Sequence, residues 1–173
     1  GVGLVAVVVS EAEVLDAVPA GKKIYIEIKG SPAIMPPVLD EVRDSELADE
    51  QVTVISYDEE VIRTCREVAP AYRCLWLSGL KKDKAGRITP SVETVIQTLD
   101  DIGADGFSSS HDLVTADFIR QVQEKGYGYH VWTVDDPAAA RRFRRWGVDS
   151  ITTNVPGAIR EAFDGADGAD VSP

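Results

Sequence analysis

Apolar runs of strand length alternate with segments of helical period along most of the chain, and this alternation limits the possible folds more than any other feature. The expected strands are residues 24–29, 52–56, 72–77, 106–109, 127–134 and 150–153. Roughly 20 to 30 residues separate successive strands, which suits right-handed βαβ crossovers. The pattern predicts about six βα units and a parallel sheet.

Start and stop signals for helices fall between these strands. At helix starts, Ser10 and Glu13 form a capping box, and Thr89 and Asp136 each precede a proline, Pro90 and Pro137, at a first helical position. At helix ends stand Gly126 and Gly147. The apolar run at residues 2–9 is expected to add a seventh strand, which a short helix over residues 10–18 would link to the strand beginning at Ile24. This strand would lie beside residues 24–29.

Composition fits one soluble domain and narrows its partners. The chain has 173 residues, of which 44% are hydrophobic and 27% charged, and its net charge is -11. This charge argues against nucleic acid or an anionic membrane as the main partner, and the longest apolar run is too short for stable membrane insertion. The two cysteines, Cys65 and Cys74, are expected to be buried free thiols, since they form no metal-binding motif.

Two architectures fit a parallel sheet of this kind, an open doubly wound sheet and a (β/α)8 barrel. No GxGxxG or GxxxxGK[ST] phosphate loop follows a strand to favour the first. The domain is expected over residues 1–163, with a disordered acidic tail over 164–173. A cytoplasmic location is slightly favoured, and export stays open because the chain begins with Gly rather than Met.

The stretch KIYIEIKG, residues 23–30, places charge inside an otherwise apolar strand. Because side chains alternate in a strand, Glu27 and Lys29 share one face with Tyr25, opposite the isoleucines. A parallel sheet is covered on both faces, so these charges require a wet cavity such as the carboxyl-end mouth of a barrel. The alternative is an exposed edge strand, in which both charges face solvent.

Three segments carry a resemblance to a known family. IEIKG, VTVISYDEEVIRTCREVAP and GYGYHVWTVDDPAAARRFRRWGVDSITTNVPG resemble successive parts of the glycerophosphodiester phosphodiesterase family, over about residues 11–162. EIK alone is a weak signal, whereas VWTVDD followed by GVDSITTNVP at this spacing is a strong one. The resemblance implies an incomplete TIM (β/α)8-type barrel and metal-dependent hydrolysis of glycerophosphodiesters to glycerol 3-phosphate and an alcohol.

Roles for individual residues follow from the same resemblance. It implies that Glu27 is a ligand of a divalent cation, Ca²⁺ or Mg²⁺, and that Lys29 contacts the substrate phosphate. It also implies that substrate is bound by Ser56 and Tyr57, at the position of the family's S-F turn, and by Trp132, which stands where a tryptophan lines the glycerol pocket. For Lys29, a structural ion pair with a carboxylate such as Glu27 is the alternative.

The chain also departs from the family pattern. Tyr57 replaces a phenylalanine, and Asn154 replaces an aspartate, so a hydrogen bond can persist there without the charge. The H-R-G and E-x-D segments that supply two histidines and further carboxylates have no counterpart in this sequence. The two histidines present, His111 and His130, occupy neither catalytic position, and His130 is expected to be a hydrogen-bonded residue of the barrel interior.

These departures leave two hypotheses for function. The first is a phosphodiesterase of this family whose chain, acting alone, is weak or inactive, because Glu27 and Lys29 cannot hold a cation and also supply a general acid and base. The alternative is a non-catalytic binding or assembly module, in which open barrel edges pair with another copy of the chain.

Overall fold

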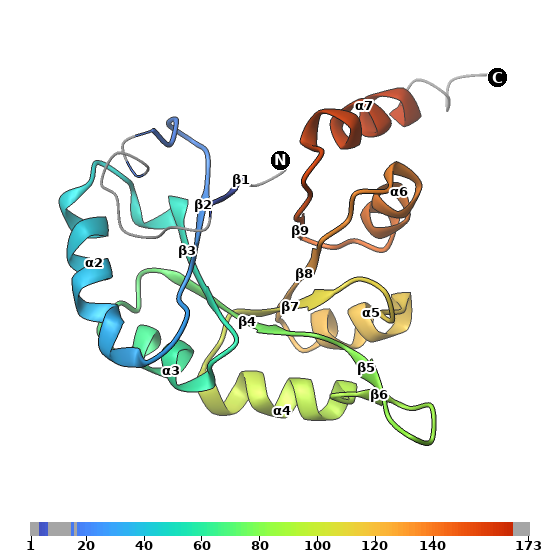
Figure 1. Ribbon diagram of the computed structural model, residues 1–173, viewed down its shortest axis with the longest axis horizontal. Helices are drawn as coiled ribbons and strands as arrows, with labels where there is room; N and C mark the ends of the chain where they lie inside the picture. The colour runs from blue at the N-terminus through green and yellow to red at the C-terminus, as the bar shows by residue number, and fades with distance from the viewer. Residues whose placement is uncertain (1–3, 7–14, 16, 168–173) are drawn as a thin grey trace.

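A curved sheet of seven parallel strands forms the centre of the molecule. The computed structural model describes residues 4–6, 15 and 17–167 (Figure 1). The strands of this sheet are β1 (Leu4–Ala6), β2 (Ile24–Glu27), β3 (Val52–Ser56), β4 (Arg73–Ser78), β7 (Gly106–Ser110), β8 (Gly128–Trp132) and β9 (Ser150–Ile151). Their order across the sheet is their order along the chain.

Helices connect the strands and follow one another around the outside of the sheet, as Figure 1 shows. They are α2 (Met35–Asp44), α3 (Glu59–Val68), α4 (Val92–Ile102), α5 (Ala116–Glu124), α6 (Pro137–Arg145) and α7 (Pro156–Asp167), with short 3-10 turns at Pro32–Ile34 and Asp49–Gln51. None of the helices in the described part of the chain is long and apolar enough to cross a membrane.

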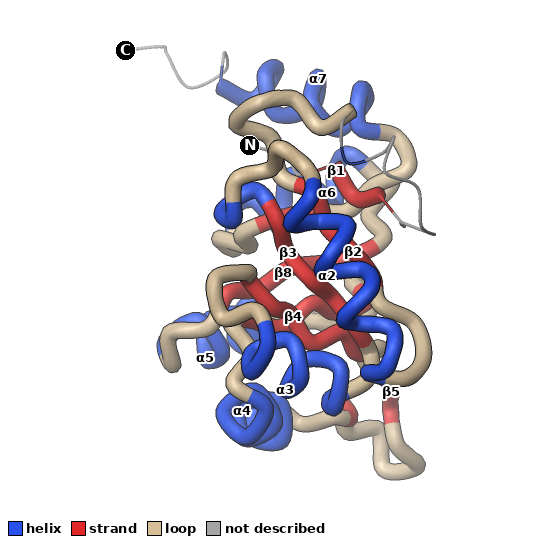
Figure 2. The backbone as a smooth tube through the Cα atoms, turned by 90° about the vertical axis from the view of Figure 1, so that its left-hand side faces the viewer, coloured by secondary structure: helices blue, strands red, loops and turns tan. Residues whose placement is uncertain are grey.

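The strand order decides between the two architectures. In a doubly wound sheet the order reverses at a switch point, whereas here every crossover steps in one direction. Figure 2 shows the resulting curl of the sheet, with α2 and α3 packed outside it. β1 and β9 are the outer strands of the described sheet, and no ladder joins them. The fold is therefore an incomplete (β/α)8-type barrel, as the family resemblance implied.

Side-chain alternation divides the sheet into two faces. In β2, Ile24 and Ile26 are 1% exposed and join the large cluster that the helices cover. Tyr25 belongs to a second, smaller cluster with Ile55 and the inward leucines of β4. The alternation expected for the KIYIEIKG stretch is thus confirmed, and the smaller cluster marks the inside of the barrel.

The structure confirms most of the predicted helix starts and ends that fall within its described residues. The Asp136 carboxylate caps α6 by accepting bonds from the Ala138 and Ala139 amides, and Gly126 and Gly147 adopt positive φ angles after α5 and α6. The expected start near Pro90 is wrong, because Ser91 caps α4 through the Thr94 amide instead. The Ser10–Glu13 capping box lies outside the described residues.

Three further segments show how far the predicted elements agree with the structure. The predicted N-terminal strand is confirmed over residues 4–6, which pair in parallel with β2, while 2–3 and 7–9 lie outside the described residues. A two-stranded hairpin, β5 (Lys81–Lys82) with β6 (Ile88–Thr89), lies in a segment for which no strand was predicted. Helix α7 continues to Asp167, so residues 164–167 are helical rather than part of a disordered tail.

Candidate functional site

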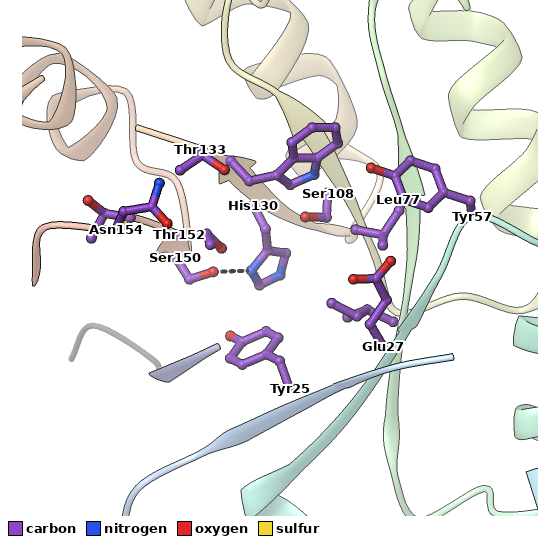
Figure 3. Close-up of a pocket in the computed structure, with 13 residues that line it drawn as sticks. Tyr25, Glu27, Tyr57, Leu77, Ser108, His130, Thr133, Ser150, Thr152 and Asn154 are labelled. Carbon is purple, nitrogen blue, oxygen red and sulfur yellow. Dashed lines mark hydrogen bonds between the residues drawn. The ribbon is translucent and has the colours of Figure 1, made fainter. Parts of the chain in front are cut away.

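A cavity of about 300 Å³ opens on the inner face of the sheet (Figure 3). Its lining comes mainly from the carboxyl-terminal ends of the strands and the loops that follow them, where (β/α)8 proteins place their active sites. The lining residues are Tyr25, Glu27, Ile55, Tyr57, Leu77, Ser108, His130, Trp132, Thr133, Ser150, Thr152, Thr153 and Asn154.

Glu27 is the single carboxylate among the described residues that line this cavity. It is the last residue of β2, and its side chain is 14% exposed. Figure 3 shows its carboxylate directed into the space near His130 and Tyr57. Parallel pairing beside Ile55 of β3 sets this direction, because it fixes which side chains of β2 face inward.

Lys29 lies at the rim rather than in the cavity. The strand ends two residues before it, its side chain is 69% exposed, and it is absent from the cavity lining. The Lys29 Nζ atom lies 3.7 Å from Glu27 Oε1, which is the ion pair considered as the alternative to a phosphate contact. An ion pair this exposed contributes little to stability.

Tyr57 and Trp132 form an aromatic wall on one side of the cavity. Their ring centroids lie 6.0 Å apart with an interplanar angle of 75°, a favourable edge-to-face arrangement. Partial burial raises the pKa of the Tyr57 hydroxyl, and the negative charge of Glu27 raises it further, so the phenol stays protonated. The Trp132 indole Nε1 is buried and has no hydrogen-bond partner among the described residues.

Ser56 lies on the other side of its strand and does not line the cavity. Its hydroxyl donates to the Ile28 carbonyl oxygen at 2.8 Å and accepts from the Asp58 amide at 3.1 Å. These bonds tie the end of β2 to the turn after β3. Ser56 therefore positions the chain on either side of Tyr57, which does reach the cavity.

His130 occupies the interior beneath the mouth, as expected. Its Nδ1 atom lies 2.7 Å from the Ser150 hydroxyl, and its Nε2 atom has no hydrogen-bond partner among the described residues. Burial is the main cause that lowers the pKa of His130 to about 4, opposed in part by the charge of Asp149. The imidazole is therefore neutral at pH 7, which suits a structural polar group inside a barrel.

His111 follows β7 in a loop outside the cavity lining. Its Nε2 atom lies 3.2 Å from Asp112 Oδ1, and its backbone amide donates to the Trp132 carbonyl oxygen at 3.0 Å. The amide bond helps to fix the end of β8. The described geometry does not bring the His111 imidazole together with Glu27.

A hydrogen-bonded cluster holds the opposite rim in place. Asp135 accepts bonds from the Thr153 hydroxyl at 2.9 Å, from the Asn154 amide nitrogen at 2.8 Å and from the Asn154 side chain at 2.9 Å. These bonds lower the pKa of Asp135 below its ordinary value. An aspartate at position 154 would face Asp135 with a like charge, whereas the asparagine donates to it, so the expected hydrogen bond is present.

The described residues do not form a complete site for a divalent cation. Calcium takes six to eight oxygen ligands and magnesium about six, and carboxylates usually supply some of them. No group of three or more His, Cys, Asp or Glu side chains within the described part of the chain is arranged to hold a metal. Glu27 alone remains as a candidate ligand.

Several cavity residues were not singled out from the sequence. They include Ser108, Ser150 and Thr152. Strand alternation was the available signal for Ser150, because it pairs with His130, whose side chain faces inward. No sequence pattern distinguishes Ser108 from its serine neighbours in β7.

The fold places this chain among (β/α)8-type barrel proteins, and its cavity lies at the carboxyl ends of parallel strands. A sequence profile of the Glycerophosphoryl diester phosphodiesterase family matches residues 8–158. The chain belongs to this family. A search of curated protein sequences returns no significant match.

Solved structures of phosphodiesterases share this fold. A candidate glycerophosphoryl diester phosphodiesterase from Silicibacter pomeroyi is 25% identical, with a TM-score of 0.75 over 90% of this chain and 56% of its own. An Oleispira antarctica phosphodiesterase, in complex with the product sn-glycerol-3-phosphate, is 14% identical, with a TM-score of 0.71 over 83% and 56%. A Parabacteroides distasonis glycerophosphodiester phosphodiesterase is 19% identical, with a TM-score of 0.65 over 83% and 57%. The chain thus spans little more than half the length of each.

Proposed function

We propose that this chain forms part of the substrate-binding mouth of an enzyme that hydrolyses glycerophosphodiesters to glycerol 3-phosphate and an alcohol. One observation carries the proposal. Glu27, Tyr57 and Trp132 come from three different strands or their following loops, and all three line one cavity. The family to which the chain belongs supports this assignment of substrate class.

The cavity offers different chemistry on its two sides. The Tyr57–Trp132 wall consists of apolar ring surface and an indole N–H that has no partner among the described residues, which suit the carbon skeleton and a hydroxyl of a glycerol group. Glu27 is the proposed cation ligand, and Lys29 at the rim is the proposed phosphate contact. Ser56 contributes indirectly, because it holds the turn that presents Tyr57.

Turnover needs more than this mouth contains. Hydrolysis of a phosphodiester requires one group to take a proton from water and another to protonate the leaving alcohol. His130 is the sole histidine lining the described cavity, and it is neutral and bonded to Ser150. We therefore expect weak or no hydrolysis from these 173 residues alone.

Hydrolysis of glycerophosphocholine, with Ca²⁺ or Mg²⁺ added, tests this expectation. Glu27→Gln removes the cavity carboxylate, and Glu41→Gln, an exposed glutamate on α2, is the matched control. Turnover close to background in all three proteins is the expected result. Strong turnover that Glu27→Gln abolishes and Glu41→Gln preserves would show that the catalytic site within this chain is more complete than proposed.

A binding module without catalysis is the second candidate. This candidate is favoured by the cavity lining, whose described residues include aromatic and polar side chains that can contact a ligand but no pair that could act as general acid and base. Calorimetry would detect binding of glycerol 3-phosphate without turnover. Native mass measurement addresses the accompanying expectation of self-association through β1 and β9, and a monomer at all concentrations would count against it.

A further inference from the structure

Two cysteine sulfurs meet in the outer layer of the barrel. Cys65 lies in α3 and Cys74 in β4, and their Sγ atoms are 2.7 Å apart. Both residues are fully buried, with 0% exposure. A covalent disulfide has an S–S length of about 2.05 Å, so the two sulfurs lie within a small displacement of bonding distance.

The chain between the two cysteines is already folded back on itself. The Ala69 amide donates to the Cys65 carbonyl oxygen at 2.8 Å, and the Tyr72 amide donates to the Ala69 carbonyl oxygen at 3.0 Å. These bonds return the chain from α3 to β4 within a few residues. A cross-link here would close a short loop that the backbone bonds already hold in shape.

Two charged side chains, those of Asp105 and Arg66, hold the backbone around Cys74 close to the backbone around Cys65. Asp105 accepts from the Cys74 amide at 2.8 Å and pairs with Arg66 at 3.4 Å. Arg66 is the neighbour of Cys65 in α3, so the ion pair joins the backbone around one sulfur to that around the other. The facing position of the sulfurs therefore rests on several independent contacts.

The two thiols differ in acidity. A hydrogen bond from Cys74 is the main cause that lowers the pKa of Cys65, and the Arg66 charge acts in the same direction. The same hydrogen bond and burial raise the pKa of Cys74. In the packed geometry the thiolate character therefore lies at Cys65 rather than at Cys74.

We propose that Cys65 and Cys74 form an intramolecular disulfide when the chain folds in the presence of a low-molecular-weight disulfide such as oxidised glutathione. The thiolate of either cysteine, written here for Cys65, attacks one glutathione sulfur and releases the other as a thiolate, which takes up the Cys74 proton. The Cys74 sulfur then attacks Cys65 and displaces the second glutathione. Overall, the pair loses two electrons and two protons, and one oxidised glutathione becomes two glutathione thiols.

The cross-link belongs to a different part of the molecule from the proposed ligand site. Both cysteines are in the large cluster between the sheet and the helices, and neither lines the cavity. Because both sulfurs are buried in the folded chain, glutathione reaches them during folding, before α3 has packed on β4. The proposal is independent of the proposed function, and ligand binding is expected to be equal in the reduced and cross-linked proteins.

Refolding of the full chain from denaturant in a mixture of oxidised and reduced glutathione tests the proposal directly. The product is denatured, alkylated with iodoacetamide and weighed by intact mass spectrometry. The expected product is a monomer lighter than the reduced chain by two hydrogen atoms, with no alkyl group. A chain that carries two alkyl groups, or one cross-linked into dimers, would overturn the proposal.

Two single variants, Cys65→Ser and Cys74→Ser, provide the matched controls. Each is expected to give an alkylated or glutathione-bound monomer and no internal cross-link. In the wild type the cross-link is expected to raise Tm on the order of 5 to 10 °C over the reduced protein, since it restricts the unfolded chain. A cross-linked monomer that melts below the reduced protein would contradict the prearranged geometry.

Discussion

The two faces of the curved sheet differ in how closely their side chains are packed. The outer face packs against the helices in one continuous cluster that includes Ile26, Phe107 and Phe143, each at most 1% exposed. The inner face carries a much smaller cluster of Tyr25, Ile55, Leu75 and Leu77, and all of these except Leu75 line the open cavity. Packing on all sides stabilises the outer layer, whereas the inner layer leaves room for a ligand.

The difference extends to polar groups. On the outer side, Asp105 and Arg66 are satisfied by hydrogen bonds that hold α3, β4 and β7 in register. On the inner side, His130 Nε2 and Trp132 Nε1 are buried without a partner among the described residues. Unpaired buried donors and acceptors are unfavourable unless something else, a ligand or water, meets them. The inner face therefore stabilises the fold less than the outer face does.

Two isoleucines on neighbouring strands test this contrast most strongly. Ile26→Ala removes a side chain packed on all sides and is expected to lower the free energy of unfolding by about 3 to 4 kcal/mol. Ile55→Ala, beside the cavity, is expected to lower it by about 2 kcal/mol or less, because part of its surface faces open space. Urea denaturation of both variants measures the two losses, and equal losses would break the comparison.

His130 gives the inner face a dependence on pH. Unfolded histidine takes up a proton below about pH 6.5, whereas folded His130 stays neutral until about pH 4. The unfolded state therefore binds more protons in this interval, and the free energy of unfolding falls as pH drops, by on the order of 3 kcal/mol in total. Urea denaturation at a series of pH values measures the slope.

The matched variants for this slope are His130→Gln and His111→Gln. The first is expected to flatten the slope between pH 6.5 and 4, and the second, outside the cavity lining, is expected to leave it in place. If the free energy of unfolding of His130→Gln still fell with pH as in the wild type, groups other than His130 would be taking up the protons on unfolding.

The rim cluster gives the smallest expected effect. Hydrogen bonds from Asn154 and Thr153 lower the pKa of Asp135, so its stabilising contribution is present above the ordinary carboxyl pKa and is lost as pH falls through the lower folded value. Asp135→Asn is expected to release the Asn154 amide with little change in Tm. Chemical shifts of the Asn154 amide, followed by NMR during an acid titration, measure the effect, and an amide that titrates equally in the variant would contradict it.

Sequence periodicity predicted the outer layer more completely than the inner one. Residues 52–56 form β3 as predicted, and the isoleucines of β2 face the helices because a strand has period two. The same rule places Ser56 on the Val54 side, away from the cavity, although the family resemblance suggested a binding role for it. Lys29 lies beyond the last residue of β2, so alternation alone could not fix its exposure.

Contacts between segments that are distant in the sequence could not be predicted from the sequence without a known family. Trp132 and Glu27 are far apart in the chain, and only the curvature of the sheet brings them to one cavity. The facing sulfurs of Cys65 and Cys74 likewise depend on how α3 packs on β4. The β5–β6 hairpin was missed because each of its strands has only two residues, too short for a periodic signal.

An NMR titration with glycerol 3-phosphate tests most directly whether the inner face binds ligand. The chain has three tryptophans, with Trp132 in the cavity, Trp76 in the outer cluster and Trp146 beside α6. We predict that the Trp132 indole N–H, assigned with Trp132→Phe, shifts most and that the Trp146 signal stays in place. A saturating titration that leaves Trp132 unmoved, or moves Trp146 as far, would contradict the account.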